Sequence, residues 1–247
     1  ITHILLTHYH GDHILGLPGL LQTLASLGRT APLTITGPAG LDAVAAPVSA
    51  LAGPLPFAVH WQEAGNAPFA AGPLTVTPVP LQHRVPCCGY ALHLPRAGRF
   101  DTARAKAAGI PVSLWGRLQA GESVDGFTPD QVLGPARRGL TVVYATDTRP
   151  CPALLDAARD ADLLCMDATY ADDADLDKAK LYGHATCRET GALAAKAGVR
   201  RLWLTHYSAA VTDLQPGLAA AQSQYPGAVA GTDGLRLELD FDKGDNP

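Results

Sequence analysis

Hydrophobic residues in the first third of the chain alternate between short β-type runs and a stretch of helical spacing. The runs over 1–7, 33–36 and 74–79 are rich in leucine and β-branched residues, which predicts strands. Leucines recur at helical spacing over 17–27 and Gly28 follows, which predicts a helix that ends there.

The same alternation continues in the second half of the chain. Its last apolar run alternates with polar residues, as a half-buried closing strand does. The pattern predicts strands over 141–145, 162–166, 201–205 and 235–241, and helices over 152–160, 188–197 and 214–224. Strands that alternate with helices are typical of the α/β class, which is the expected fold class.

One segment, residues 95–136, interrupts this alternation. It is rich in Gly, Pro and Arg, and we expect little regular structure in it. An irregular segment of about forty residues is usually functional or disordered, and a solvated surface insertion is the alternative.

Composition narrows the class of protein. The 247 residues suffice for one large domain or two small ones, and 47% hydrophobic with 17% charged residues excludes wholesale disorder. No apolar run reaches the roughly eighteen residues of a membrane-spanning helix. Five cysteines without C-x-x-C spacing favour neither a disulfide framework nor a cysteine zinc ribbon, so a cytoplasmic location is expected.

Charge is distributed unevenly along the chain. The net charge of -4 argues against a surface that attracts nucleic acid everywhere. The segment 96–117 nevertheless carries five basic residues against one acid, Asp101, so it is +4 and the rest of the chain is -8. Its basic residues are Arg96, Arg99, Arg104, Lys106 and Arg117.

The strongest chemical signal is the sequence HYHGDH at residues 8–13. Its three imidazoles and one carboxylate offer the nitrogen and oxygen atoms that zinc binds. In an extended chain His8 and His10 point to the same side and can share one metal ion. The turn at Gly11 lets Asp12 and His13 face a second ion about 3.5–4 Å away, as two-metal hydrolases require. A histidine-rich loop that binds metal adventitiously is the alternative.

This H-x-H-x-D-H pattern resembles the signature of the metallo-β-lactamase superfamily. Further ligands of that family are present in order, at His83, Asp147 and His206. The resemblance implies two zinc ions, with manganese as an open alternative, in a metallo-β-lactamase-type αβ/βα four-layer sandwich. One ion would be held by His8, His10, His83 and Asp147, and the other by Asp12, His13, Asp147 and His206. We interpret His3, His60 and His93, which match no position of the pattern, as structural.

Several shorter motifs are more specific. GDHILGLPGLLQTL from residue 11, Asp-Thr-Arg-Pro at 147–150, Ala-Thr-Tyr at 168–170 and Gly-His-Ala-Thr at 183–186 resemble ribonuclease Z, the tRNA 3′-processing endonuclease family. The resemblance spans nearly the whole chain. It implies a cytoplasmic homodimer that removes the 3′ trailer from precursor tRNA and leaves a 3′-hydroxyl. Asp12 would orient the attacking water and accept its proton, and His184 would donate to the phosphate or the leaving oxygen. Residues 186–189 also fit a capping box.

The resemblance gives the interrupting segment a role. Ribonuclease Z carries an arm between the positions of His83 and Asp147 that grips tRNA, so we expect 95–136 to be a tRNA-binding arm inserted in one hydrolase domain, residues 1–247. Asp167 stands where the family usually has Glu. The family also begins well before the H-x-H-x-D-H strand, so we expect the chain to be N-terminally incomplete. The expected tRNA contacts are Arg99, Arg104, Lys106 and Arg117.

Two other functions remain open at this point. A phosphodiesterase of the same fold, acting on small phosphodiesters or cyclic nucleotides, would share every metal ligand, and only the arm would separate it from ribonuclease Z. A catalytically silent metal-binding or RNA-binding module is the second alternative.

Overall fold

The computed structural model describes residues 1–241 and divides into two compact units. The first unit joins Ile1–His93 to Thr141–Leu237, and the second is Leu94–Leu140 together with the described residues from Glu238. Within the described residues, no helix is long and apolar enough to cross a membrane.

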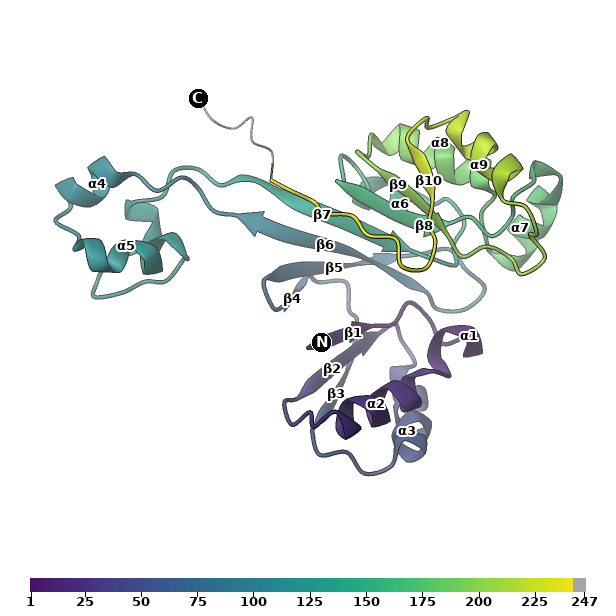
Figure 1. The fold of residues 1–247 in the computed structure, drawn as a ribbon, viewed down its shortest axis with the longest axis horizontal. Helices are drawn as coiled ribbons and strands as arrows, with labels where there is room; N and C mark the ends of the chain where they lie inside the picture. The colour runs from purple at the N-terminus through teal and green to yellow at the C-terminus, as the bar shows by residue number, and fades with distance from the viewer. Residues whose placement is uncertain (242–247) are drawn as a thin grey trace. The chain divides into compact units, whose positions relative to one another are not determined.

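The first unit begins with a small parallel sheet of order β1-β2-β3. Two helices, α2 and α3, pack on one face of this sheet (Figure 1). Leu21 of α2 and Leu41 of α3 share a buried cluster with Ile35 of β2. The elements of this part are β1 (His3–Leu5), α1 (Gly11–Ile14), α2 (Leu17–Ser26), β2 (Leu33–Gly37), α3 (Leu41–Ala52) and β3 (Val59–Glu63).

A larger sheet follows, with strand order β10-β9-β8-β7-β6-β5-β4. Strands β7 to β10 run parallel, whereas β4, β5 and β6 pair antiparallel. Its strands are β4 (Phe69–Ala71), β5 (Leu74–Pro80), β6 (Cys88–Arg96), β7 (Arg137–Ala145), β8 (Leu163–Asp167), β9 (Leu202–Thr205) and β10 (Ala228–Ala230). Its helices are α6 (Pro152–Ala157), α7 (Leu176–Tyr182), α8 (Cys187–Ala197) and α9 (Gln215–Gln222), with a 3-10 turn at Asp173–Asp175.

The two sheets pack against each other in the first unit. Leu5 of β1 packs against the buried Val76 and Tyr90 of the larger sheet, and the Tyr90 hydroxyl donates to the carbonyl oxygen of Leu6 at 2.7 Å. Leu193 of α8 and other helical residues cover the far face of the larger sheet. Helices outside two packed sheets make the αβ/βα sandwich, so the predicted fold class is confirmed.

The second unit corrects one expectation. Little regular structure was predicted here, but the chain forms α4 (Thr102–Ala107), α5 (Val112–Gln119) and a 3-10 turn at Pro129–Gln131. Asp101 caps α4 by accepting from the backbone N–H groups of residues 103 and 104, both at 2.9 Å. The unit also has a buried core of its own, formed by Ala105, Ile110, Leu118, Val124 and Val132.

The predicted closing strand over 235–241 is wrong, because the structure gives these residues no strand. Leu235 and Leu237 remain 39% and 37% exposed. Apolar alternation is not sufficient for a strand, which also needs a partner whose backbone groups complete the ladder. The other predicted strands and helices of the first unit are confirmed, with bounds that shift by a few residues.

Candidate metal centre

The HYHGDH segment turns sharply after β1. His10 is the N-cap of the short helix α1, and Asp12 and His13 lie within that helix. The His8 ring is fully buried, and its Nδ1 lies 3.1 Å from the Thr7 hydroxyl. This contact leaves the His8 Nε2 atom to face the other histidines.

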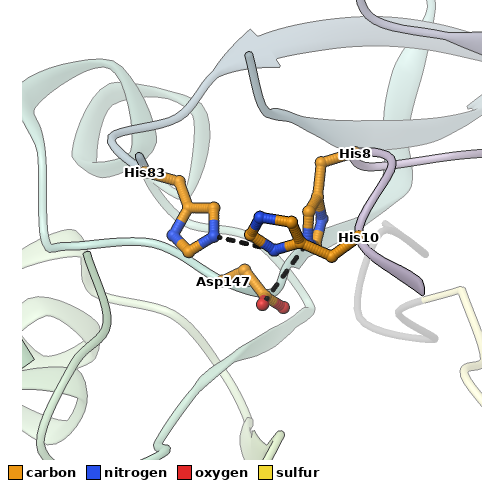
Figure 2. A group of neighbouring side chains, drawn as sticks. All are labelled: His8, His10, His83 and Asp147. Atoms are coloured by element: carbon orange, nitrogen blue, oxygen red, sulfur yellow. Dashed lines mark hydrogen bonds and ion pairs between the residues drawn. The ribbon is translucent and has the colours of Figure 1, made fainter. Parts of the chain in front are cut away.

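Four side chains converge in a first cluster (Figure 2). His10 Nδ1 lies 3.1 Å from His8 Nε2 and 3.4 Å from His83 Nε2. His8 Nε2 is also 3.5 Å from Asp147 Oδ2. Three imidazole nitrogens and a carboxylate oxygen that face one another are suited to bind a single cation.

A second cluster adjoins the first through the other carboxylate oxygen of Asp147. Asp147 Oδ1 lies 3.4 Å from His13 Nε2 and 3.2 Å from His206 Nε2. Asp12 Oδ2 lies 3.2 Å and 4.0 Å from the same two nitrogens. The buried His13 Nε2 lies between these two carboxylates, and its hydrogen bond with Asp147 raises the pKa of His13, so a metal ion bound here would take the place of that proton. Asp147 therefore faces both clusters, one oxygen to each.

Burial and hydrogen bonding set the protonation states of these ligands. Burial lowers the pKa of His8 to about 4, although the Asp147 carboxylate opposes the shift, and burial also lowers the pKa of His83. Burial alone would raise the pKa of Asp147, but the hydrogen bond with His13 and neighbouring positive charge hold it well below its usual range. Near neutral pH, His8 and His83 are thus uncharged and Asp147 is ionised, as metal ligation requires.

Two of the converging side chains sit on unusual backbone. Asp147, just after β7, has φ of 52°, and His206, immediately after β9, has φ of 61°. Asp and His tolerate this left-handed region better than most residues. The conformation turns each side chain across the strand ends, where ligand sites of such sheets usually form.

His184 lies beside the clusters on the loop between α7 and α8. Its Nδ1 is 2.8 Å from Asp167 Oδ2, and its ring stacks on His206 with centroids 5.3 Å apart. The preceding Gly183 carries φ of 76°, and its carbonyl oxygen lies 2.9 Å from His83 Nδ1. A Cβ atom on Gly183 would come within 2.9 Å of His83, so the close approach requires glycine.

A cap and an ion pair hold the His184 loop from outside. The predicted capping box is confirmed, with Glu189 N donating to the Thr186 hydroxyl and Thr186 N to the Glu189 carboxylate. Arg149 binds the same carboxylate through two nitrogens and donates to the carbonyl oxygen of His184 at 2.5 Å. Arg149 thus links the Asp-Thr-Arg-Pro motif to the His184 loop.

Replacing Arg149 should loosen this loop and lower stability. Arg149→Met keeps the aliphatic stem but leaves the half-buried Glu189 without its partner, so the free energy of unfolding should fall by about 1.5–3 kcal/mol. Urea unfolding of the purified variant measures the loss. Arg159→Met removes an exposed Arg–Asp pair at the C-terminal end of α6 and should cost under about 1 kcal/mol. Equal losses in the two variants would contradict a special role for Arg149.

Sequence reasoning missed three contributors to this site. Arg149 and Thr169 lie in the family motifs and Asp167 at a departure from the family pattern. The sequence assigns no function to these three residues, because their roles depend on contacts with residues distant in the chain. The three histidines read as structural lie outside the metal-binding groups of the described chain, and two have short polar contacts. These contacts are His3 with Thr2, and His93 with Thr141.

The expected tRNA contacts lie in the second unit. Arg104 and Lys106 are on α4 and Arg117 is on α5. Arg104 pairs with Asp101 at 3.6 Å, and Arg117 pairs with Glu122 at 2.6 Å.

Comparisons with known proteins agree with the fold. Residues 1–207 match the family model described as the beta-lactamase superfamily domain. Ribonuclease Z of Lachnospira eligens is 41% identical over 97% of this chain and 81% of its own length. Ribonuclease Z of Lachnoclostridium phytofermentans is 37% identical over the same shares. The crystal structure of human tRNase Z, short form, superposes with a TM-score of 0.63 at 22% identity, over 98% of this chain and 80% of that one.

The chain is therefore a hydrolase of the metallo-β-lactamase superfamily. The similarity to the two bacterial proteins is not confined to the hydrolase core, since it covers nearly the whole chain. Within the superfamily, the chain belongs to the ribonuclease Z family.

Proposed function

We propose that this chain is a zinc-dependent endoribonuclease that removes the 3′ trailer from precursor tRNA and leaves a 3′-hydroxyl on the tRNA. The observation that carries the proposal is Asp147, whose two carboxylate oxygens face two separate groups of histidines in a chain of the ribonuclease Z family. A shared carboxylate is the usual way to hold two ions close enough to act on one phosphodiester.

The spacing of the side chains suits two zinc ions, with manganese as the alternative. Ligand atoms about 2.0–2.1 Å from a tetrahedral zinc lie roughly 3.3 Å from one another. The neighbouring nitrogen and oxygen atoms of the two clusters are mostly 3.1–3.5 Å apart. His8, His10, His83 and Asp147 would hold one ion, and Asp12, His13, Asp147 and His206 the other.

The ions would supply Lewis-acid chemistry, lowering the pKa of water and stabilising the charge that develops on the phosphate. The remaining steps belong to side chains. Asp12 is 69% exposed, so its carboxylate can orient the attacking water and accept its proton. Since His184 Nδ1 faces Asp167, its Nε2 atom is available to donate to a phosphate oxygen or to the leaving 3′ oxygen.

The second unit would bind the body of the tRNA. Arg99, Arg104, Lys106 and Arg117 would contact its phosphates. The Arg104 and Arg117 side chains are more than half exposed in their ion pairs, and such pairs are weak enough for phosphate to replace the acid. Homodimerisation and a cytoplasmic location also remain predictions.

Removing the second unit tests the assignment of substrate. Gly98 and Gly134 touch through their backbones, so a deletion of residues 99–133 that joins them should leave the metal centre intact. We expect the KM for precursor tRNA to rise steeply, while hydrolysis of bis(p-nitrophenyl) phosphate survives. The salt dependence of tRNA binding should also weaken, by about 0.7–0.9 in log–log slope for each lost phosphate contact.

A full-length variant with Ala at the four basic positions serves as the control for folding. If either variant loses both substrates equally, the segment supports the fold rather than tRNA binding. If the intact chain cleaves only the small ester, it is the phosphodiesterase alternative. Two bound ions without any cleavage would favour the silent module.

A further inference from the structure

The Thr169 hydroxyl lies where two functional histidines meet. Thr169 follows β8 by two residues and is only 6% exposed. Its Oγ1 atom lies 2.9 Å from His206 Nδ1, 3.1 Å from His184 Nδ1 and 2.8 Å from Asp167 Oδ1. One oxygen atom therefore contacts a candidate metal ligand, the candidate proton donor and a buried carboxylate.

The directions of these hydrogen bonds follow from the number of protons. A hydroxyl has one proton to donate, and the Asp167 carboxylate can only accept it. The Thr169 oxygen must then accept from the histidines, so the proton of His206 lies on Nδ1. His184 also carries a proton on Nδ1, which donates to Asp167 Oδ2 at 2.8 Å, so this ring donates from Nε2 only when both of its nitrogens are protonated.

This arrangement fixes which ring atom each histidine presents to the site. With Nδ1 protonated, the Nε2 of His206 has a free lone pair, and it is this atom that lies 3.2 Å from Asp147 Oδ1. The His206 and His184 rings are within 12° of parallel. The Thr169 hydroxyl oxygen thus contacts the Nδ1 atom of both rings.

Asp167 cannot take the place of the Thr169 hydroxyl as the hydrogen-bond partner of His206, because both of its oxygens already accept hydrogen bonds. Its Oδ1 accepts from the Thr169 backbone N–H and hydroxyl, and its Oδ2 accepts from Thr148 N and His184. Within residues 1–241, His206 Nδ1 has the Thr169 hydroxyl as its hydrogen-bond partner.

We propose that Thr169 is a positioning residue that holds His206 as the Nδ1–H tautomer and so sets the affinity of the metal position formed by Asp12, His13, Asp147 and His206. The same oxygen helps to hold the His184 ring stacked on the His206 ring. This inference rests on the proposed two-metal site. Outer hydrogen-bond partners of ligating histidines typically contribute about 10–100-fold to metal affinity.

The test is competitive zinc titration of the metal-free full-length chain against a chromophoric chelator. Thr169→Val removes the hydroxyl at nearly constant volume and should weaken one of two zinc equivalents by about 10–100-fold, leaving the other unchanged. Thr169→Ser should restore wild-type affinity. With both ions bound at saturating zinc, Thr169→Val should lower kcat for precursor tRNA more than it changes KM.

Thr36→Val is the matched control. Thr36 is also a buried threonine of the first unit, but its hydroxyl makes no hydrogen bond to the described chain, so zinc affinity should not change. Thr169→Ala supplies a second hydroxyl-free variant if Thr169→Val fails to fold.

The possible outcomes separate this inference from the proposed function. Wild-type chain that binds fewer than two zinc ions contradicts the two-metal proposal itself. Wild type that binds two ions and hydroxyl-free variants that bind both with unchanged affinity overturn the role of Thr169 alone. Equal weakening of both equivalents, or failure of Thr169→Ser to restore affinity, would also overturn it, because a tautomer effect is confined to the His206 position.

Discussion

Asp147→Ala is expected to lose both metal ions and all cleavage in one step. The two carboxylate oxygens face different clusters, so their removal leaves each cluster one negative ligand short. The rate should fall by at least about 10⁴-fold, since removing the ions takes away both water activation and charge stabilisation. Elemental analysis after gel filtration, alongside a precursor tRNA cleavage assay, measures the two losses together.

Asp162→Ala is the matched control for this change. Asp162 is as buried as Asp147, at 2% exposed, but it accepts from the Thr141 backbone N–H and lies outside the candidate metal-binding groups of the described residues. It should lower stability without changing metal content. Two tightly held ions in Asp147→Ala would remove Asp147 from the site.

His184→Ala should separate chemistry from metal binding. The loss of a proton donor typically lowers the rate by about 10²–10⁴-fold, or roughly 3–5 kcal/mol of barrier. Because the interaction forms mainly in the transition state, kcat and kcat/KM should fall by similar factors while metal content stays constant. Single-turnover cleavage of precursor tRNA with zinc quantification measures both.

This test must distinguish proton transfer by His184 from metal binding by His184. His184 also falls within a third group of side chains close enough to share a metal ion, together with Asp147 and His206. A variant that loses a metal ion would therefore assign His184 to ligation rather than to proton transfer. His93→Ala, which removes a half-buried histidine bonded to Thr141, should change neither quantity.

The sequence made part of this site visible because four candidate ligands lie within six consecutive residues. Their order along an extended strand and a tight turn is enough to place them together. His83, Asp147 and His206 are separated by long stretches of chain, and only the family pattern connected them. What the residues themselves suggested was a polar side chain at each strand end, where parallel strands bring distant positions to one edge.

Contacts that depend on tertiary packing could not be predicted from the sequence. The helices of the second unit went unrecognised because Gly and Pro interrupt its helical stretches, although Asp101 before α4 is an ordinary N-cap signal. The strand predicted over 235–241 failed for the opposite reason, since its local pattern was good and it lacked a ladder partner. Thr169 could not be assigned because its role depends on where two distant rings meet.

The left-handed backbone at Asp147 and His206 has a consequence for engineering this enzyme. Each such residue costs on the order of 1 kcal/mol or more, which glycine would recover. A redesign that optimises stability alone would therefore count these two residues among its targets. The thermostable product would keep the sandwich and lose the centre, so stabilising mutations are better sought away from the ends of β7 and β9.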